Sequence, residues 1–300
     1  MEKQGIKGRS LSHNQAMEQE KYQDEVSTKE QADYNGVYLT KKDAEEYGEY
    51  KRRKKYAEIN KAVSSSLSTT LWGEDTQRVC GRAIRLKQCA VKVPLTQVSQ
   101  AYYYLLGYKV GIDCVVGLGG ETLGKVKAYE SRIALRKKAN AITLILTPSL
   151  IDCCRYGEAR KEIKKVKRAI GKNTLTVRVE KSYPQSTLSR LARLVSETGA
   201  KYFSVPYFKG CERLKADLFS GCGLEVTGVE TEEIFRFLSK NGVDRIVSNS
   251  VAEIQASWLK EVESERFLSE TEKPKEPPLP AQTKGEGYLC QGENGEWKFV

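Results

Sequence analysis

Lysine and glutamate side chains at the ends of predicted strands are the residues of this chain that could do chemistry together. Lys92 and Glu180 each close a short apolar run, and Glu225 lies within another. An amine beside carboxylates can bind an aldehyde or a sugar, and a lysine can form an imine with a carbonyl. The same three residues can instead pair as a buried ionic plug without activity, which is the interpretation we favour.

Several other kinds of catalysis are excluded by residue type. The chain has one histidine, His13, in a polar segment, so a histidine-based triad, a Cys-His dyad and a His-ligated zinc ion are excluded from the core. Its eight cysteines include no Cys-x-x-Cys pair, and Cys153 and Cys154 are adjacent. We expect reduced, mostly buried cysteines, no metal site and no cofactor.

The positive charge of the chain is concentrated in its middle. The net charge is +11, but residues 61–260 alone carry 33 basic and 18 acidic side chains, a net +15. Such a segment attracts anions, either phosphorylated small molecules or nucleic acid. The basic residues within 155–172 have no aromatic residue among them, so we interpret them as a solvated helix face and expect no nucleic-acid partner. They are Lys161, Lys164, Lys165, Lys167 and Arg168.

Eight strand-length apolar runs alternate with amphipathic segments of helical period. This spacing is typical of parallel strands with right-handed crossovers and predicts a (β/α)₈ barrel, an α/β fold of about 250 residues. A doubly wound open sheet is the alternative, but no Gly-x-Gly-x-x-Gly opens a helix. The predicted strands cover 63–71, 88–93, 110–116, 141–146, 175–180, the start of 200–210, 223–226 and 245–248.

The two ends of the chain differ in composition from the middle. Residues 1–55 are predicted to form a polar arm and a basic helix, residues 56–268 the barrel, and residues 269–300 a proline-rich linker and a β-hairpin turning at Asn294-Gly295. The arm and the hairpin are candidates for docking a protein partner, and a homo-oligomer is a further candidate. Without an 18-residue apolar run or a signal-like start, we expect a cytoplasmic protein with no membrane contact.

Five stretches of the predicted barrel together resemble the deoxyribose-phosphate aldolase family of (β/α)₈ barrels, the class I aldolases. Their order and spacing extend over about two hundred residues, and no one of them is decisive. The stretches are Cys114–Gly117, Lys125–Glu130, Ala139–Ile142, Thr198–Phe203 and Gly242–Ser250.

The resemblance implies Schiff-base aldol cleavage, but the residues that would perform it are substituted. The family's nucleophilic lysine on strand six corresponds to Ser204, its second lysine on strand seven to Glu225, and its strand-four aspartate to Thr143. A serine cannot form an imine. We therefore expect a degenerate aldolase-like barrel, a pseudoenzyme that binds a phosphorylated ligand or acts as a scaffold. An active carbon–carbon lyase using a displaced lysine such as Lys92 is the alternative, and a nucleic-acid-associated protein is a further one.

Phosphate binding is the family property that the sequence retains best. Barrels bind phosphate with backbone amides that follow strands seven and eight. Here Gly228, Ser248, Asn249 and Ser250 occupy those positions. The loop after strand seven is short, so Gly228 could simply form the turn into the next helix.

Overall fold

The computed structural model describes residues 41–219, 221–271, 289–291 and 297–299. The chain divides into two compact units, residues 1–259 and 260–300. Residues 1–40 of the predicted N-terminal segment, residues 272–288 of the predicted linker and the predicted hairpin turn at Asn294-Gly295 lie outside the described residues. The proposed domain boundaries remain predictions.

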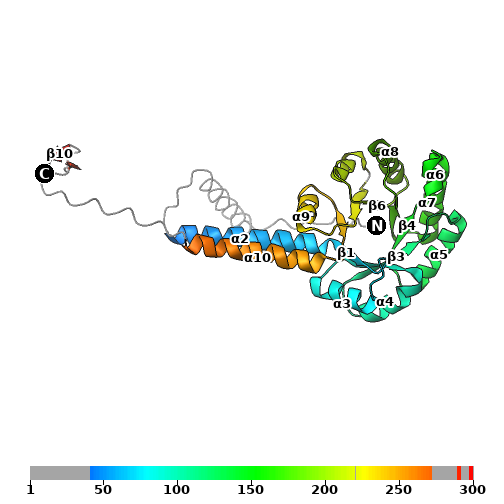
Figure 1. Cartoon of the computed structure of the whole chain (residues 1–300), viewed down its shortest axis with the longest axis horizontal. Helices are drawn as coiled ribbons and strands as arrows, with labels where there is room; N and C mark the ends of the chain where they lie inside the picture. The colour runs from blue at the N-terminus through cyan, green and yellow to red at the C-terminus, as the bar shows by residue number, and fades with distance from the viewer. Residues whose placement is uncertain (1–40, 220, 272–288, 292–296, 300) are drawn as a thin grey trace, which may run out of the picture. The chain divides into compact units, whose positions relative to one another are not determined.

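Eight parallel strands close into a barrel in sequence order, which confirms the predicted (β/α)₈ fold (Figure 1). The last strand pairs with the first through only two pairs of residues, Ser66 with Ile246 and Leu67 with Val247. The strands are β1 (Ser66–Thr69), β2 (Ala90–Pro94), β3 (Gly111–Val116), β4 (Ala141–Ile145), β5 (Thr174–Arg178), β6 (Tyr202–Pro206), β7 (Gly223–Thr227) and β8 (Arg245–Val247).

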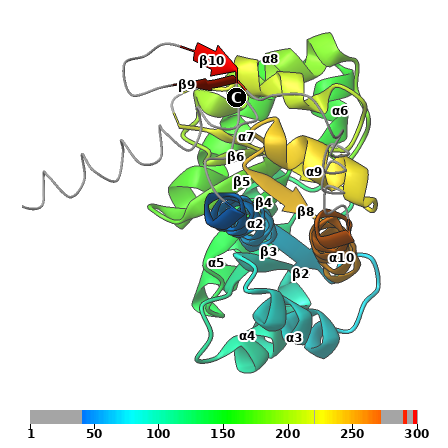
Figure 2. The same ribbon diagram turned by 90° about the vertical axis from the view of Figure 1, so that its left-hand side faces the viewer.

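A helix follows each strand, with α3 and α4 on one side of the strands and α6 and α8 on another (Figure 2). A further helix precedes the first strand. The helices are α2 (Lys41–Ser64), α3 (Thr76–Leu86), η1 (Leu95–Gln97), α4 (Val98–Leu105), α5 (Gly124–Arg136), α6 (Pro148–Asp152), α7 (Tyr156–Ile170), α8 (Gln185–Ser196), η2 (Cys211–Asp217), α9 (Glu232–Lys240) and α10 (Val251–Thr271).

The apolar core lies between the strands and the helices. Every residue of β4 is buried, as expected for a strand covered on both faces. Helix α7 buries Ile163, Val166 and Ile170 along one stripe and turns its lysines outward. The sequence pattern therefore buries the apolar stripe of α7 and leaves most of its charged side chains in solvent.

Two helices depart from their predicted form. The predicted helix over 150–170 is interrupted between α6 and α7, where Cys154 has a φ of 56° in the left-handed region. The predicted helix after β6 is the 3₁₀ helix η2, and it ends at Asp217. Neither departure moves a strand, so the barrel order is unaffected.

In the second unit, β9 (Leu289–Gln291) and β10 (Trp297–Phe299) pair antiparallel, as the predicted hairpin requires. Among the described residues, no helix combines the length and the apolar character needed to cross a bilayer.

Candidate functional site

The lumen of the barrel holds a buried polar cluster centred on Lys92 of β2. Its Nζ donates hydrogen bonds to Asp113 Oδ2 at 2.7 Å and to Thr143 Oγ1 at 2.6 Å. Glu225 Oε1 lies 3.2 Å from the same nitrogen. Thr143 Oγ1 in turn donates to Asp113 Oδ1 at 2.8 Å. The lysine ammonium, with its three N–H groups, therefore faces an acceptor on each of three sides.

This cluster is closed to solvent. Lys92, Asp113, Thr143 and Glu225 are each 0% exposed. Glu225 accepts no hydrogen bond of good geometry among the described residues, so its contact with Lys92 is an ion pair only. Two carboxylates face one ammonium within the cluster. Arg245 of β8, whose Cα is paired with that of Glu225, supplies a second positive charge nearby.

Ser204 lies in the middle of β6, next to this cluster. Its Cα pairs with that of Glu225 on one side and that of Arg178 on the other, so these side chains share the lumen face. Ser204 is 0% exposed, and neither its hydroxyl nor that of Thr176 has a hydrogen-bond partner among the described residues. Within the described part of the chain, no base therefore lies within hydrogen-bond reach of the Ser204 hydroxyl to activate it.

Glu180 does not belong to the cluster, contrary to the prediction that grouped it with Lys92 and Glu225. Strand β5 ends at Arg178, and Glu180 is exposed beyond that end. Arg178 is the last lumen-facing residue of β5 instead. Its Nε is buried without a partner among the described residues.

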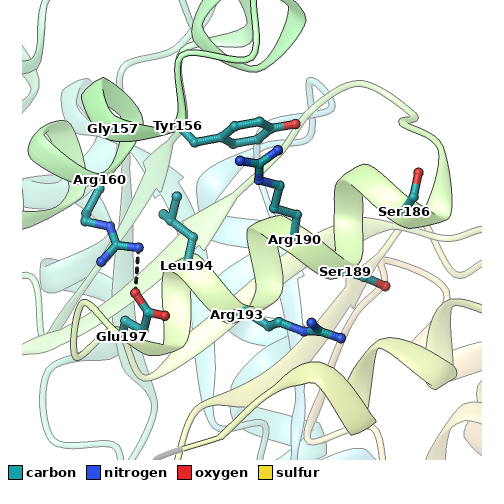
Figure 3. A pocket seen from close by; sticks show the side chains of 9 residues that line it. All are labelled: Tyr156, Gly157, Arg160, Ser186, Ser189, Arg190, Arg193, Leu194 and Glu197. Carbon is teal, nitrogen blue, oxygen red and sulfur yellow. Dashed lines mark ion pairs between the residues drawn. The ribbon is translucent and has the colours of Figure 1, made fainter.

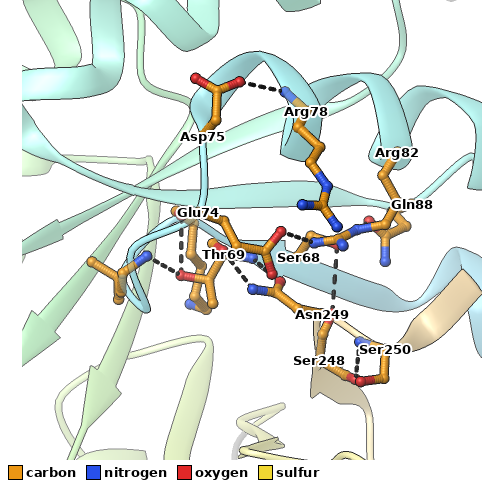
Figure 4. A network of polar contacts seen from close by, with 12 residues as sticks. Ser68, Thr69, Glu74, Asp75, Arg78, Arg82, Gln88, Ser248, Asn249 and Ser250 are labelled. Carbon is orange, nitrogen blue, oxygen red and sulfur yellow. Dashed lines mark hydrogen bonds and ion pairs between the residues drawn. The ribbon is translucent and has the colours of Figure 1, made fainter.

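The four predicted phosphate-binding residues lie after β7 and β8. Of these, Ser248, Asn249 and Ser250 make hydrogen bonds within the protein (Figure 4). Asn249 accepts from the Thr69 backbone N–H and donates to the Thr69 carbonyl, both at 2.9 Å. The Ser250 backbone N–H donates to Ser248 Oγ at 3.1 Å. Gly228 has a φ of 76° and nothing within 4 Å of where a side chain would begin. The backbone at Gly228 is therefore exposed and uncovered by other side chains.

Sequence patterns did not predict that Asp113 and Lys127 belong to buried polar clusters. Asp113 was read as part of an apolar strand, although a carboxylate inside such a strand requires a partner. Lys127 of α5 is 0% exposed and donates to Gly120 O, Ile145 O, Thr147 Oγ1 and Glu162 Oε1, each at 2.8 Å. Its place between lysines of a basic helix gave no sign of this burial.

In the described part of the chain, histidine, cysteine and carboxylate side chains nowhere form a group of three that could hold a metal ion. Burial, with the charge of Asp113 as a smaller cause, raises the pKa of the Cys114 thiol to about 12. Burial also raises the pKa of the Cys80 thiol to about 11. These two cysteines stay protonated at neutral pH and are not nucleophiles.

The closed barrel defines a (β/α)₈ protein with a charged, lysine-centred cluster in its lumen. Comparison with solved structures agrees on the fold. A deoxyribose-phosphate aldolase structure from Coccidioides immitis matches with a TM-score of 0.62 and 20% identity, over 71% of this chain and 96% of that one. A tetrameric deoxyribose phosphate aldolase from Aeropyrum pernix matches with a TM-score of 0.58 and 18% identity, over 68% and 93% of the two chains.

Curated relatives give the family. A deoxyribose-phosphate aldolase of Clostridioides difficile (strain 630) is 30% identical over 138 residues, 45% of this chain and 62% of that relative, so the match spans under two thirds of its length. One of Clostridium botulinum (strain Eklund 17B / Type B) is 30% identical over 150 residues, 49% of this chain and 67% of the relative. No protein-family model matches the sequence. The chain belongs to the deoxyribose-phosphate aldolase family.

Proposed function

We propose that this barrel is a binding or scaffold protein of the aldolase family that does not perform Schiff-base aldol cleavage. The observation that carries the proposal is the state of Lys92. Its Nζ is 0% exposed and is engaged by Asp113, Thr143 and Glu225. An imine-forming amine needs a free lone pair and access for a carbonyl compound. Ser204, at the family's nucleophile position, offers no amine.

The alternative function is an active carbon–carbon lyase in which Lys92 forms the imine. The favouring observation is that Lys92 lies in the lumen with a carboxylate on either side, Asp113 and Glu225, either of which could move a proton. For this function the cluster must open, because Lys92 must exchange its present partners for a substrate.

Reductive trapping separates the two functions. The protein is incubated with acetaldehyde or deoxyribose phosphate, reduced with borohydride, digested and mapped by mass spectrometry. We expect no adduct on Lys92, while the Clostridioides difficile relative, treated in parallel, serves as the positive control. An adduct confined to Lys92 overturns the proposal and supports the lyase alternative, which cleavage of deoxyribose phosphate would then establish.

We also propose that the ligand is phosphorylated and that its phosphate binds in the open space beside Gly228. The net charge of +15 over residues 61–260 supports an anionic ligand, and the exposed backbone at Gly228, directly after β7, leaves room for one. Deoxyribose phosphate at millimolar concentration should raise the melting temperature, since a ligand that binds only the folded state stabilises it. Deoxyribose without phosphate is the control. An unchanged melting temperature with both compounds removes this part of the proposal.

A further inference from the structure

A groove of about 580 Å³ lies on the outside of the barrel between α7 and α8. Tyr156 and Arg160 of α7 line one side, and Ser186, Arg190 and Arg193 of α8 line the other (Figure 3). The groove is separate from the lumen cluster. Its lining combines one aromatic ring, the apolar side chain of Leu194, hydroxyl groups, three guanidinium groups and one carboxylate, that of Glu197.

Two of the three arginines are neutralised by carboxylates, and the third is not. Arg160 pairs with Glu197 at 2.6 Å, and Arg193 pairs with Asp217 at 2.8 Å. The Arg190 guanidinium lies 4.1 Å from the centre of the Tyr156 ring. Among the described residues, no carboxylate lies within ion-pair distance of Arg190, so it is available to an anion.

The outward face of α7 continues this positive charge. Lys161, Lys164, Lys165 and Arg168 are exposed, and none is paired with a carboxylate in the described part of the chain. The helix has only two acidic residues. Glu158 pairs with Arg155, and Glu162 is buried against Lys127. The track from Tyr156 to Arg168 is about 18 Å long at 1.5 Å per residue, long enough for several phosphates of one strand.

We propose that the groove and the exposed face of α7 together bind a single strand of nucleic acid. The exposed cations of α7 contact the phosphates, and a base stacks on the Tyr156–Arg190 pair, because planar guanidinium and aromatic groups are the platforms on which single-stranded bases stack. From the sequence alone, α7 has no aromatic residue among its lysines. The fold supplies the platform by placing Arg190 of α8 on Tyr156 at the start of α7.

A base-stacking platform favours nucleic acid over an acidic peptide, which would use the charges but not the planar surfaces. Arginine also suits phosphate, since its N–H groups form a planar fork that matches phosphate oxygens. The proposed binding does not depend on the chemistry of the lumen. A test of aldol cleavage therefore neither supports nor contradicts the proposed nucleic-acid binding.

Fluorescence anisotropy with a labelled single-stranded oligonucleotide of about twelve nucleotides tests the proposal. Log Kobs should fall linearly with log salt concentration, with about 0.7 of slope for each phosphate contact on a single strand. Arg190→Ala should weaken binding about tenfold by removing one contact and the stacked plane. Replacing Lys161, Lys164 and Arg168 together by alanine should reduce the slope by about 2.

Arg78→Ala is the matched control, since Arg78 is an exposed arginine on α3 and its loss changes the net charge equally. It should leave affinity and salt slope unchanged. Circular dichroism establishes that each variant is folded. The proposal is overturned by no binding at about 50 mM salt, by equal losses in Arg190→Ala and Arg78→Ala, or by tighter binding of a polyglutamate peptide of the same length.

Discussion

Lys92 is a residue whose removal should damage the fold rather than only the site. It neutralises Asp113 and Glu225 inside a lumen where all three are 0% exposed. In Lys92→Met, two carboxylates remain buried with one fewer positive charge. Breaking a buried ion pair in this way typically costs about 3–5 kcal/mol, and we expect a loss of that size in the free energy of unfolding measured with urea.

A second variant distinguishes charge from packing as the cause. When Asp113→Asn and Glu225→Gln are added to Lys92→Met, the buried charges are removed together, and a large part of the lost stability should return. Lys125→Met, on the exposed side of α5, should change stability by less than about 0.5 kcal/mol. A Lys92→Met variant as stable as Lys125→Met would show that the cluster does not stabilise the barrel.

At the scale of elements, strand periodicity predicted some site residues and misplaced others. Lys92 and Glu225 were grouped correctly because both interrupt apolar strands, and the structure brings them within 3.2 Å. Glu180 has the same side-chain parity as Arg178, but β5 ends two residues before it, so it is exposed. Asp113 was missed because its strand was read as a continuous apolar run. The face of a strand to which a residue points follows from alternation in the local sequence, whereas the residue at which the strand ends depends on tertiary packing.

Successive side chains of a strand point to opposite faces, and the two central residues of β3 show the effect of this alternation on their chemistry. Asp113 faces the lumen, and the neighbouring Cys114 faces the opposite side, where it is 0% exposed. Burial raises the pKa of the Cys114 thiol from its ordinary value of 9.0 to about 12. In the folded state the thiol therefore keeps its proton at a pH where the unfolded chain has lost it.

We accordingly expect stability to fall as the pH rises above about 9. Between the two pKa values the unfolded state binds fewer protons than the folded state, so the free energy of unfolding decreases with pH. This thiol alone contributes up to about 1.4 kcal/mol per pH unit. Urea unfolding between pH 8 and pH 10 under reducing conditions measures the slope, which Cys114→Ala should make shallower.

Cys153→Ala serves as the control for this pH dependence, because Cys153 is exposed. Its slope should equal that of the unmodified protein. If Cys114→Ala and Cys153→Ala have the same slope, other groups are responsible for the loss of stability at alkaline pH.

For the whole molecule, the sequence predicted the order of strands and helices because each element carries its own hydrophobic period. It could not predict the break between α6 and α7, which depends on the left-handed backbone of Cys154. Nor could it predict how the barrel closes, since closure joins residues 180 positions apart. Asn249, predicted as a ligand-binding residue, illustrates this limit. Its amide group joins the loop after the last strand to the first strand, a contact that the sequence did not indicate.

Asn249 extends the seam between β1 and β8, the pair of neighbouring strands that shares the fewest paired residues in the barrel. Strands β1 and β8 share two pairs of residues, whereas β2 and β3 share five. Beyond those two pairs, the Asn249 side chain accepts from the N–H of Thr69 and donates to its carbonyl, as a further backbone residue would. Thr69 is nearly fully buried, so both backbone groups would lack partners without this amide.

Asn249→Ala should therefore lower the free energy of unfolding by about 1–3 kcal/mol, the cost of leaving buried polar groups unpaired. Amide hydrogen exchange should accelerate first at Thr69 and along β1, because the seam opens before the rest of the barrel. Ser250→Ala, in the same loop, keeps its backbone bond to Ser248 and should stay within about 0.5 kcal/mol. Uniform acceleration of exchange around all eight strands in Asn249→Ala would mean that the seam is no weaker than the other strand pairs.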